Sequence, residues 1–431
     1  MVNVNDFNGL TDDEKIENAI KNRDSDGMVL IPPRCSDTDP ERTWWSLDRA
    51  VLLPENTTII LRNCKIMLSD KCRDNFFRTA NCGMGIAFPE KISNVHVKGE
   101  GLCVLEGADH PRATGDSSKI LANPCPYTDA DLCKYAYWVS DERKKAGKPS
   151  YKDKHTHSYG TDAGNPDESG YGDWRGIGIL FANADNFSIE NIHIAYSHGW
   201  GISLEACTNG RIEKICFNTC MSKEIDGMLQ NMENQDGIDI RNGCHNIIIS
   251  DVTGRTGDDL IALTAIANED EDFLPGGSLH TTHVMHNDWS KRDKDIHDIL
   301  IRNVMGYSQL CYLIRLLPCN SRIWNVVIDG VVDTSPDDLE PFGGLLLGDL
   351  DDEYGINLPD SMRNISISNV VCNRPNAICV DGCLSDSVIS NVTNRKNNCP
   401  AVIVSRENGL KNVKMSNLCA VGTEPLCKDD R

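Results

Sequence analysis

The chain has 431 residues, of which 43 are Lys or Arg and 64 are Asp or Glu, so its formal net charge at pH 7 is −21. This acidic excess argues against nucleic acid and against an anionic membrane surface as partners, because both attract clustered positive charge. No run of apolar residues approaches the roughly 18 that a membrane-spanning helix needs. The length is compatible with two or three average domains or with one large elongated domain.

The N-terminal sequence MVNVNDFNGLTDDEKIENAIKN has neither a basic segment nor an apolar segment of the kind that signal peptides contain. The 19 cysteines are scattered, without the paired CxxC spacing of structural zinc sites. Buried thiols in a reducing compartment explain this pattern best, because free Cys packs as a small apolar side chain. These features predict a cytoplasmic protein, and a leader missing from the given chain is the alternative.

Residues 1–34 are predicted to form an N-terminal cap. The tetrapeptide TDDE at 11–14 is a capping box, and apolar residues at helical spacing follow it. We therefore expect a short amphipathic helix that begins at Asp12, followed by a strand over 28–31 that ends at two prolines. Such a helix would cover the open end of a stack of repeats.

A tetrapeptide recurs along the rest of the chain: an apolar residue, a polar residue, then Asn, Asp, Lys or Gly, then a second apolar residue. Its eight copies begin at Ile189, Ile212, Ile249, Ile301, Ile328, Ile367, Ile389 and Met415. The intervals are 23, 37, 52, 27, 39, 22 and 26 residues, and we interpret the longer ones as the base period plus a loop. A period in the low twenties is typical of a solenoid.

Two short strands per repeat, separated by a polar turn and stacked on the same strands of the next repeat, make a parallel β-helix. The predicted fold class is therefore all-β, with residues 1–431 as one domain. A β-sandwich is the alternative, which the lack of regularly spaced hairpin dipeptides disfavours. The polar, Tyr-, Lys- and Gly-rich segment 108–173 interrupts the pattern, and we expect it to emerge as a long loop beside the binding face.

Three acidic residues lie about one repeat apart in NQDGIDI…TGDDLIAL: Asp236, Asp258 and Asp259. Asp236 and Asp258 are 22 residues apart, and equivalent residues of neighbouring coils stack at ~4.8 Å. Crowded carboxyl groups repel one another, which raises at least one pKa and places an acid beside a base, as glycosidic hydrolysis requires. The alternatives are ordinary polar turns, which collect Asp, and a site for a hard cation.

NQDGIDI followed by TGDDLIAL resembles the paired NTDGxD and GDD motifs of glycoside hydrolase family 28, the polygalacturonases and their relatives. The N-terminal sequence is similar to the cap of the wider pectate-lyase-like superfamily. The resemblance implies a right-handed, single-stranded parallel β-helix and inverting hydrolysis without a metal or another cofactor. It assigns Asp258 as the general acid, Asp236 and Asp259 as the pair that activates water, and Asp239 as a structural residue.

The family's Arg-Ile-Lys motif corresponds to YLIRLLP at 312–318, so Arg315 matches the Arg and Leu317 replaces the Lys. The resemblance makes Arg315 a candidate ligand of the sugar at the cleaved bond. Because that Lys helps to bind the uronate carboxylate in the family, both a uronate and a neutral sugar are open as substrates.

The family's Gly-His-Gly motif has no direct counterpart. Three histidines lie in the corresponding region: His280, His283 and His286. His280 has the closest spacing, 21 residues after Asp259, and is a candidate sugar ligand; a metal cluster and a solvated loop are the alternatives. Upstream, three more side chains able to stack on a sugar or hydrogen-bond to it are candidate ligands: His198, Trp200 and Glu205. Trp200 alternates with apolar residues, and this alternation slightly favours a core position over sugar binding.

These features predict a glycoside hydrolase that acts on short pectin-derived or related plant oligosaccharides. The bulky insertion suggests exo action, because it would close one end of the binding face. The acidic surface disfavours an intact polyanionic polymer as substrate. The rival interpretations are a polysaccharide lyase on the same fold, a hydrolase of a neutral-sugar glycoside, and a non-catalytic carbohydrate-binding solenoid. The sequence does not indicate an oligomeric state.

Overall fold

A computed structural model describes most of the chain. The described residues are 1–36, 39–72, 74–83, 86, 88–111, 174–232, 234–266, 282–285, 289–319, 321–349, 358–406 and 409–428. Most of the predicted insertion, as well as His280 and His286, therefore lies outside the described residues. The chain divides into two compact units. Unit 1 comprises Met1–Glu205, Ser222–Gln235 and Asn268–Asp288, and unit 2 comprises Ala206–Met221, Asp236–Ala267 and Trp289–Arg431.

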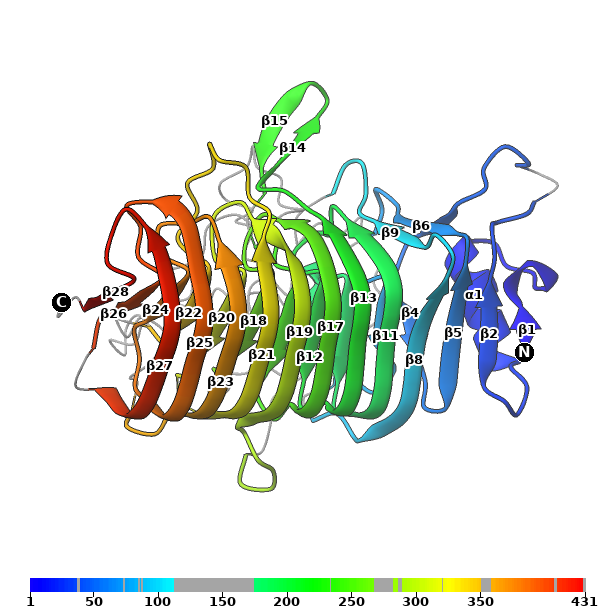
Figure 1. Ribbon diagram of the computed structural model, residues 1–431. Coiled ribbons are helices and arrows are strands. Elements are labelled where there is room, and N and C mark those ends of the chain that lie inside the picture. Colours follow the sequence, from blue (N-terminus) through cyan, green and yellow to red (C-terminus); the bar gives the residue numbers. More distant parts are fainter. Residues whose placement is uncertain are drawn as a thin grey trace, which may run out of the picture. The chain divides into compact units, whose positions relative to one another are not determined.

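Unit 1 contains two sets of parallel strands (Figure 1). In the first, neighbours pair in the order β1 (Val2–Asn3), β2 (Met28–Ile31), β5 (Thr57–Arg62), β8 (Ile92–Glu100) and β11 (Ala184–Ala195). The strands β3 (Trp45–Leu47), β6 (Lys65–Leu68) and β9 (Val104–Glu106) pair in turn, and β9 also pairs with β11. The second set runs β4 (Val51–Leu53), β7 (Phe77–Thr79), β10 (Ile179–Ala182) and β12 (Ile202–Glu205). An antiparallel hairpin, β14 (Ser222–Ile225) and β15 (Met228–Asn231), is separate from both sets.

Unit 2 also contains two sets of strands, all parallel. The first is β13 (Thr208–Asn218), β17 (His245–Thr256), β19 (Ile296–Ser308), β21 (Ile323–Asp333), β23 (Met362–Cys372), β25 (Leu384–Asn397) and β27 (Leu410–Val421). The second is β16 (Ile238–Arg241), β18 (Ile261–Thr264), β20 (Ile314–Leu317), β22 (Leu345–Leu347), β24 (Ile378–Val380), β26 (Val402–Val404) and β28 (Leu426–Lys428). Successive coils add one strand to each set, so the predicted fold, a right-handed parallel β-helix, is confirmed.

The recurring tetrapeptide has a conformational cause. Its third residue has a left-handed backbone in all eight copies, with φ between 53° and 76°: Asn191, Lys214, Asp251, Asn303, Gly330, Asn369, Asn391 and Asn417. Asn, Asp and Gly adopt this conformation most readily, which explains why they dominate the position. The bend lets both flanking apolar residues point inward, as Ile249 and Val252 do with no exposed surface.

Along each strand of the second set of unit 2, side chains point alternately into the core and outward, and the outward side chains form a row. The inward residues are at most 1% exposed: Ile238, Ile240, Ile261, Leu263, Ile314, Leu316, Leu345 and Leu347. Because successive side chains of a strand point to opposite faces, the residues between them point outward. This outer row is formed by Asp239 and Arg241, Ala262 and Thr264, and Arg315 and Leu317.

The helix predicted near the N-terminus is present in unit 1. Helix α1 spans Asp12–Lys21, and its apolar face packs against β2, β3 and β4. Thr11 Oγ1 accepts a hydrogen bond from Glu14 N at 3.4 Å, as a capping box requires. Glu14 Oε2 accepts a hydrogen bond at 2.8 Å from Leu10 N, one residue before the N-cap residue. The strand predicted over 28–31 is β2, so both N-terminal predictions are confirmed.

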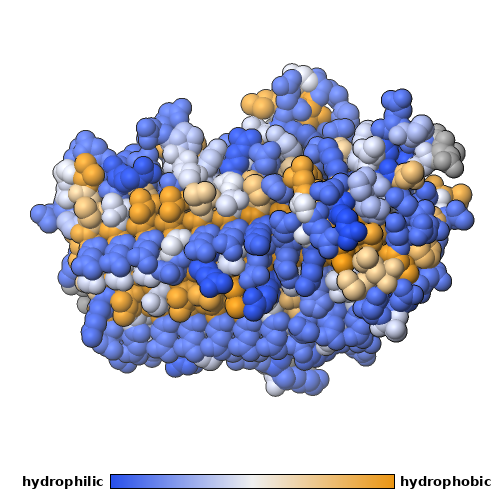
Figure 2. All heavy atoms as spheres, turned by 45° about the vertical axis from the view of Figure 1, so that its right-hand side comes forward, coloured by the Kyte–Doolittle hydropathy of each residue, from blue (hydrophilic) through white to orange (hydrophobic). Residues whose placement is uncertain are grey.

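Among its described residues, unit 1 also contains the short 3-10 helices η1 (Val4–Asp6) and η4 (Trp174–Gly176). Among the residues that the structure describes, no helix combines the length and hydropathy of a membrane span. Figure 2 shows a mostly hydrophilic surface on one face of the molecule, with hydrophobic residues emerging in bands between polar ones.

Candidate active site

Strand register in unit 2 brings the predicted acids to neighbouring coils. β16 pairs with β18 so that Ile238 lies beside Ile261. One step before this pair, Gly237 N donates a hydrogen bond to the Asp259 carbonyl at 2.9 Å. Continuing the register places Asp236 beside Asp259, rather than beside Asp258, the residue used for the 22-residue spacing. The acids therefore meet where β16 and β18 begin.

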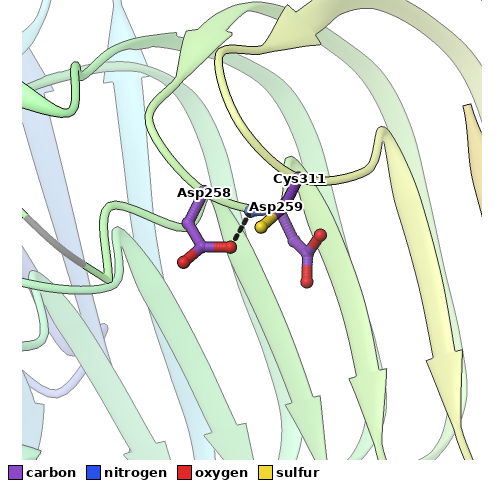
Figure 3. Close-up of side chains that lie close together, drawn as sticks. All are labelled: Asp258, Asp259 and Cys311. Carbon is purple, nitrogen blue, oxygen red and sulfur yellow. Dashed lines mark hydrogen bonds between the residues drawn. The ribbon is translucent and has the colours of Figure 1, made fainter. Parts of the chain in front are cut away.

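The two adjacent acids project into one patch although neighbours in a strand normally point apart. Asp258 lies in the turn before β18, where Thr256 Oγ1 donates to its carbonyl oxygen at 2.7 Å. Asp259 N donates to Asp258 Oδ1 at 2.9 Å, as Figure 3 shows. An oxygen of each carboxyl and the Sγ of Cys311 all lie within 4.8 Å of one another. In Figure 3 the sulfur appears between the two carboxyl groups.

The next coil, which carries β20, contacts Asp259 through Tyr312, just before the strand, and Arg315, within it. Tyr312 N donates to Asp259 Oδ1 at 2.8 Å, and Arg315 Nη1 lies 3.6 Å from Asp259 Oδ2. Arg315 belongs to the outer row, directly beside Ala262 of β18. The small Ala262 side chain leaves room for the guanidinium to approach the preceding coil.

The cluster retains protons at a pH where an isolated Asp would be ionised. Burial, followed by the charges of Asp258, Asp239 and Asp259, raises the pKa of Asp236 well above its usual value. Burial raises the pKa of Asp259 to about 7, with Arg315 opposing the shift and Asp258 adding to it. Such coupled groups titrate as a unit, so the cluster supplies both a proton and a carboxylate near neutral pH.

Exposure separates the roles of these carboxyl groups. Asp236 and Asp259 are 6% and 2% exposed, whereas Asp258 is only partly buried. A general acid must reach the leaving oxygen of a substrate, while a water-activating pair can lie deeper. Asp239, behind the cluster, is 1% exposed, and burial raises its pKa well above the usual value despite the neighbouring Arg241.

Cys311 and Tyr312 were missed in the sequence, although a signal for them existed. LIAL at 260–263 and LIRL at 313–316 follow the same pattern, and the strands that contain them are paired in register. Cys311-Tyr312 therefore takes the place of Asp258-Asp259 on the next coil. The long interval between the two copies hid this equivalence.

The donor atoms of Asp258, Asp259 and Cys311 are close enough to share a cation. The chemistry of the set disfavours it, because a cysteine binds metal as the thiolate. Burial, followed by the charges of Asp259 and Asp258, raises the pKa of the Cys311 thiol. Asp259 is also already engaged by Tyr312 N and lies beside Arg315.

The other predicted ligands that the structure describes, Glu205, His198 and Trp200, lie in unit 1, and Glu205 and His198 have protein partners. Glu205 Oε1 lies 2.7 Å from His283 Nδ1, and Oε2 accepts a hydrogen bond from Val284 N at 3.0 Å. His198 Nε2 accepts from Ala108 N at 2.9 Å. Trp200 is partly exposed, unlike the fully buried residues that follow it in alternation, so it is not an ordinary core residue.

The fold and this acidic cluster define a parallel β-helix protein with the groups of a glycoside hydrolase. The family model of glycosyl hydrolases family 28 matches residues 172–277, the segment that contains Asp236, Asp258 and Asp259. The match confirms the resemblance to family 28 over these residues, and it supports a glycoside hydrolase. No match was found among curated protein sequences.

Solved structures show the same fold at low sequence identity. The A-modules of the mannuronan C-5 epimerases AlgE4 and AlgE6 from Azotobacter vinelandii are each 11% identical, with TM-scores of 0.51 and 0.52. Each alignment covers 99% of this chain, and 97% and 96% of the respective module. A hyperthermoactive exopolygalacturonase from Thermotoga maritima is 13% identical with a TM-score of 0.46, covering 100% of this chain and 91% of that one. The two A-modules share the fold of this chain, and at 11% identity this likeness concerns the fold alone.

Proposed function

We propose that this protein is an inverting, polygalacturonase-like glycoside hydrolase that acts on pectin-derived or related plant oligosaccharides. The observation that carries the proposal is the convergence of one partly exposed and two buried carboxyl groups on adjacent coils of unit 2. The expectation of exo action rests on the insertion at 108–173, most of which is outside the described residues.

The proposed reaction uses each acid once. Asp258 gives its proton to the glycosidic oxygen as the bond to the anomeric carbon breaks. Asp236 and Asp259 hold a water molecule and accept its proton while its oxygen attacks the same carbon. Arg315, 3.6 Å from Asp259, favours the ionised form of that carboxyl and so keeps the pair able to act as a base.

The spacing of the acids bears on the stereochemical outcome. Asp258 and Asp259 present oxygens within 4.8 Å of one another. Carboxyl groups are usually about 6.5–9.5 Å apart in inverting enzymes and about 5–5.5 Å apart in retaining ones. The support for inversion is therefore the family resemblance and the pairing of Asp236 with Asp259, which places two carboxyl groups beside the water. A direct stereochemical measurement must decide.

Reducing-sugar release from a panel of uronic and neutral oligosaccharides tests the proposal. We expect wild-type protein to cleave at least one of them and Asp258→Asn to lose this activity. Asp338→Asn is the matched control, because Asp338 is an exposed acid of unit 2 far along the sequence from the cluster. Binding without cleavage would indicate a carbohydrate-binding solenoid. An unsaturated, ultraviolet-absorbing product would indicate a lyase, and either result would contradict the proposal.

A further inference from the structure

Two aromatic side chains lie beside the acids on the following coils of unit 2. Tyr312, whose backbone N–H donates to Asp259, has its ring centroid 6.2 Å from that of Phe342, with 50° between the ring planes. Phe342 is 55% exposed, and its backbone N–H donates to the Leu310 carbonyl at 2.8 Å. The pair therefore presents an aromatic surface that begins one coil, or ~4.8 Å, from Asp259.

Gly343 gives the Tyr312 ring its position. A Cβ at residue 343 would lie 3.0 Å from Tyr312 Cε1 and 2.6 Å from Asn376 Oδ1. Only a residue without a side chain leaves this space, so the ring can extend toward the coil that carries Gly343. The aromatic surface is thus held by the backbone of the next coil as well as by its own strand.

The electrostatics around this surface are unfavourable for an anion. Four carboxyl groups gather at the beginnings of β16 and β18: Asp236, Asp239, Asp258 and Asp259. Arg315 lies 3.6 Å from Asp259, and the charge of Arg241 acts on Asp239, so both cations are directed at the cluster itself. Leu317, which replaces the family's Lys, is 2% exposed in the outer row and offers no charge to a uronate.

A uronate carboxylate placed beside this cluster would be repelled by each of the four acidic groups that is ionised, and burial would strengthen that repulsion. An uncharged sugar avoids this repulsion, and its apolar ring face can pack on an aromatic side chain. The charge distribution and the aromatic pair therefore favour the same class of ligand.

We propose, on the assumption that the hydrolase function above holds, that the sugar residue next to the cleaved bond on the β20–β22 side is uncharged and stacks on Tyr312 and Phe342. The site thus selects a neutral sugar, such as a hexose with a free hydroxymethyl group, over the corresponding uronic acid. Tyr312 and Phe342 act in binding and take no part in proton transfer.

The test compares two disaccharides of the same linkage, one of galactose and one of galacturonic acid, with wild type, Phe342→Ala, Tyr312→Leu and Asp258→Asn. We expect kcat/KM to be at least about tenfold higher for the galactose disaccharide, a difference of ~1.4 kcal/mol. Phe342→Ala should raise KM for it several-fold with little change in kcat. Val388→Ala, on a side chain 41% exposed in β25, is the control for loss of an exposed apolar group and should change neither constant.

The outcomes separate this inference from the function on which it rests. Preference for the galacturonic disaccharide, or a Phe342→Ala variant that behaves like Val388→Ala, would overturn the inference even if Asp258→Asn abolishes cleavage. The hydrolase proposal itself would be wrong if Asp258→Asn still cleaves the substrate. It would also be wrong if the wild-type protein cleaves neither disaccharide and no other sugar of the panel. Added salt provides an independent check: screening should narrow the preference for the neutral sugar, because the Debye length falls from about 10 Å at 0.1 M to about 3 Å at 1 M.

Discussion

Asp236 and Asp259 are neighbours across the β16–β18 pair, although 23 residues separate them in the sequence. Their proximity follows from backbone register, since the hydrogen bond from Gly237 N to the Asp259 carbonyl fixes the two coils relative to each other at this point. A buried pair of carboxyls one strand apart is costly for folding, which is why we regard it as functional.

Asp236 and Asp259 should act as one unit on water. Asn at either position is expected to lower kcat by ~10²–10⁴, the range for loss of a general acid or base. The double variant should be only slightly worse than the worse single variant, because the second carboxylate cannot position and deprotonate water alone. Initial rates on the responding oligosaccharide would measure this. If the fold decrease in kcat of the double variant equals the product of the two single decreases, the two residues act independently.

The product should be released with inverted anomeric configuration. Proton NMR of the first turnovers, recorded before mutarotation, distinguishes the two anomers. Retention would mean that one of the acids attacks the anomeric carbon directly, in agreement with the short separation of Asp258 and Asp259. That result would reassign Asp259 from water activation to nucleophile.

Stability should fall as the pH rises from about 4 to about 7. Asp259 has a pKa of about 7 in the folded protein, against 3.8 as its ordinary value, so the folded state binds a proton that the unfolded chain releases in this interval. The same direction holds for Asp236 and Asp239, whose pKa values burial also raises. The free energy of unfolding, measured with denaturant at several pH values, should decrease across this range.

Asp239→Asn isolates the structural part of this effect. Asp239 Oδ2 has no hydrogen-bond partner among the described residues, and its carboxyl is buried. Removing the ionisable group should raise the free energy of unfolding at pH 7 by about 1–2 kcal/mol and flatten the pH dependence. A destabilised variant would instead show that the ionised Asp239 is well paired, for example by Arg241.

Cys311 should react slowly with thiol reagents, and its modification should abolish activity. Its raised pKa leaves little thiolate, the nucleophilic form, at neutral pH. The exposed Cys35, Cys419 and Cys427 should be alkylated first by iodoacetamide, without loss of activity. Slower alkylation of Cys311 should then abolish activity. The Cys311→Ser variant should keep most of the wild-type kcat and should not show this slow loss of activity. Mass spectrometry of time points would assign each phase, and rapid loss of activity would contradict the prediction.

Substitutions other than to glycine at the positive-φ positions of the recurring tetrapeptide should lower the free energy of unfolding more than substitutions at other exposed positions of the coils. Asn391 has φ 55° and donates through Nδ2 to Asn369 Oδ1 at 3.2 Å. Asn391→Ala should cost about 1–2 kcal/mol of unfolding free energy, because a Cβ without a compensating polar group is strained there. Asn391→Gly should cost less. Lys214→Gly, at φ 56°, should be neutral or stabilising. Equal effects of Ala and Gly at 391 would exclude backbone strain as the cause.

Glu205 and His283 form a pair in unit 1 that the sequence does not reveal. Glu205 Oε1 lies 2.7 Å from His283 Nδ1. No spacing rule predicts this pairing, because the two residues are 78 positions apart and part of the intervening sequence is irregular. The resemblance to the family gave a role for a His in this region but could not select which one.

The sequence by itself determined the solenoid, its N-terminal helix and the approach of Asp236 to Asp258 and Asp259. These features depend on local preferences and on a short repeat period, which the left-handed Asn and Gly positions and the buried Ile and Val rows impose coil by coil. Only the tertiary structure decided that Cys311 and Tyr312 join the acids on the next coil, and that Arg315, a sugar-ligand candidate in the sequence, lies beside Asp259. The physical reason is that strand register, set by backbone hydrogen bonds and inward apolar residues, is strict within the sheet, whereas the length of a loop between coils is only weakly constrained by its closure entropy.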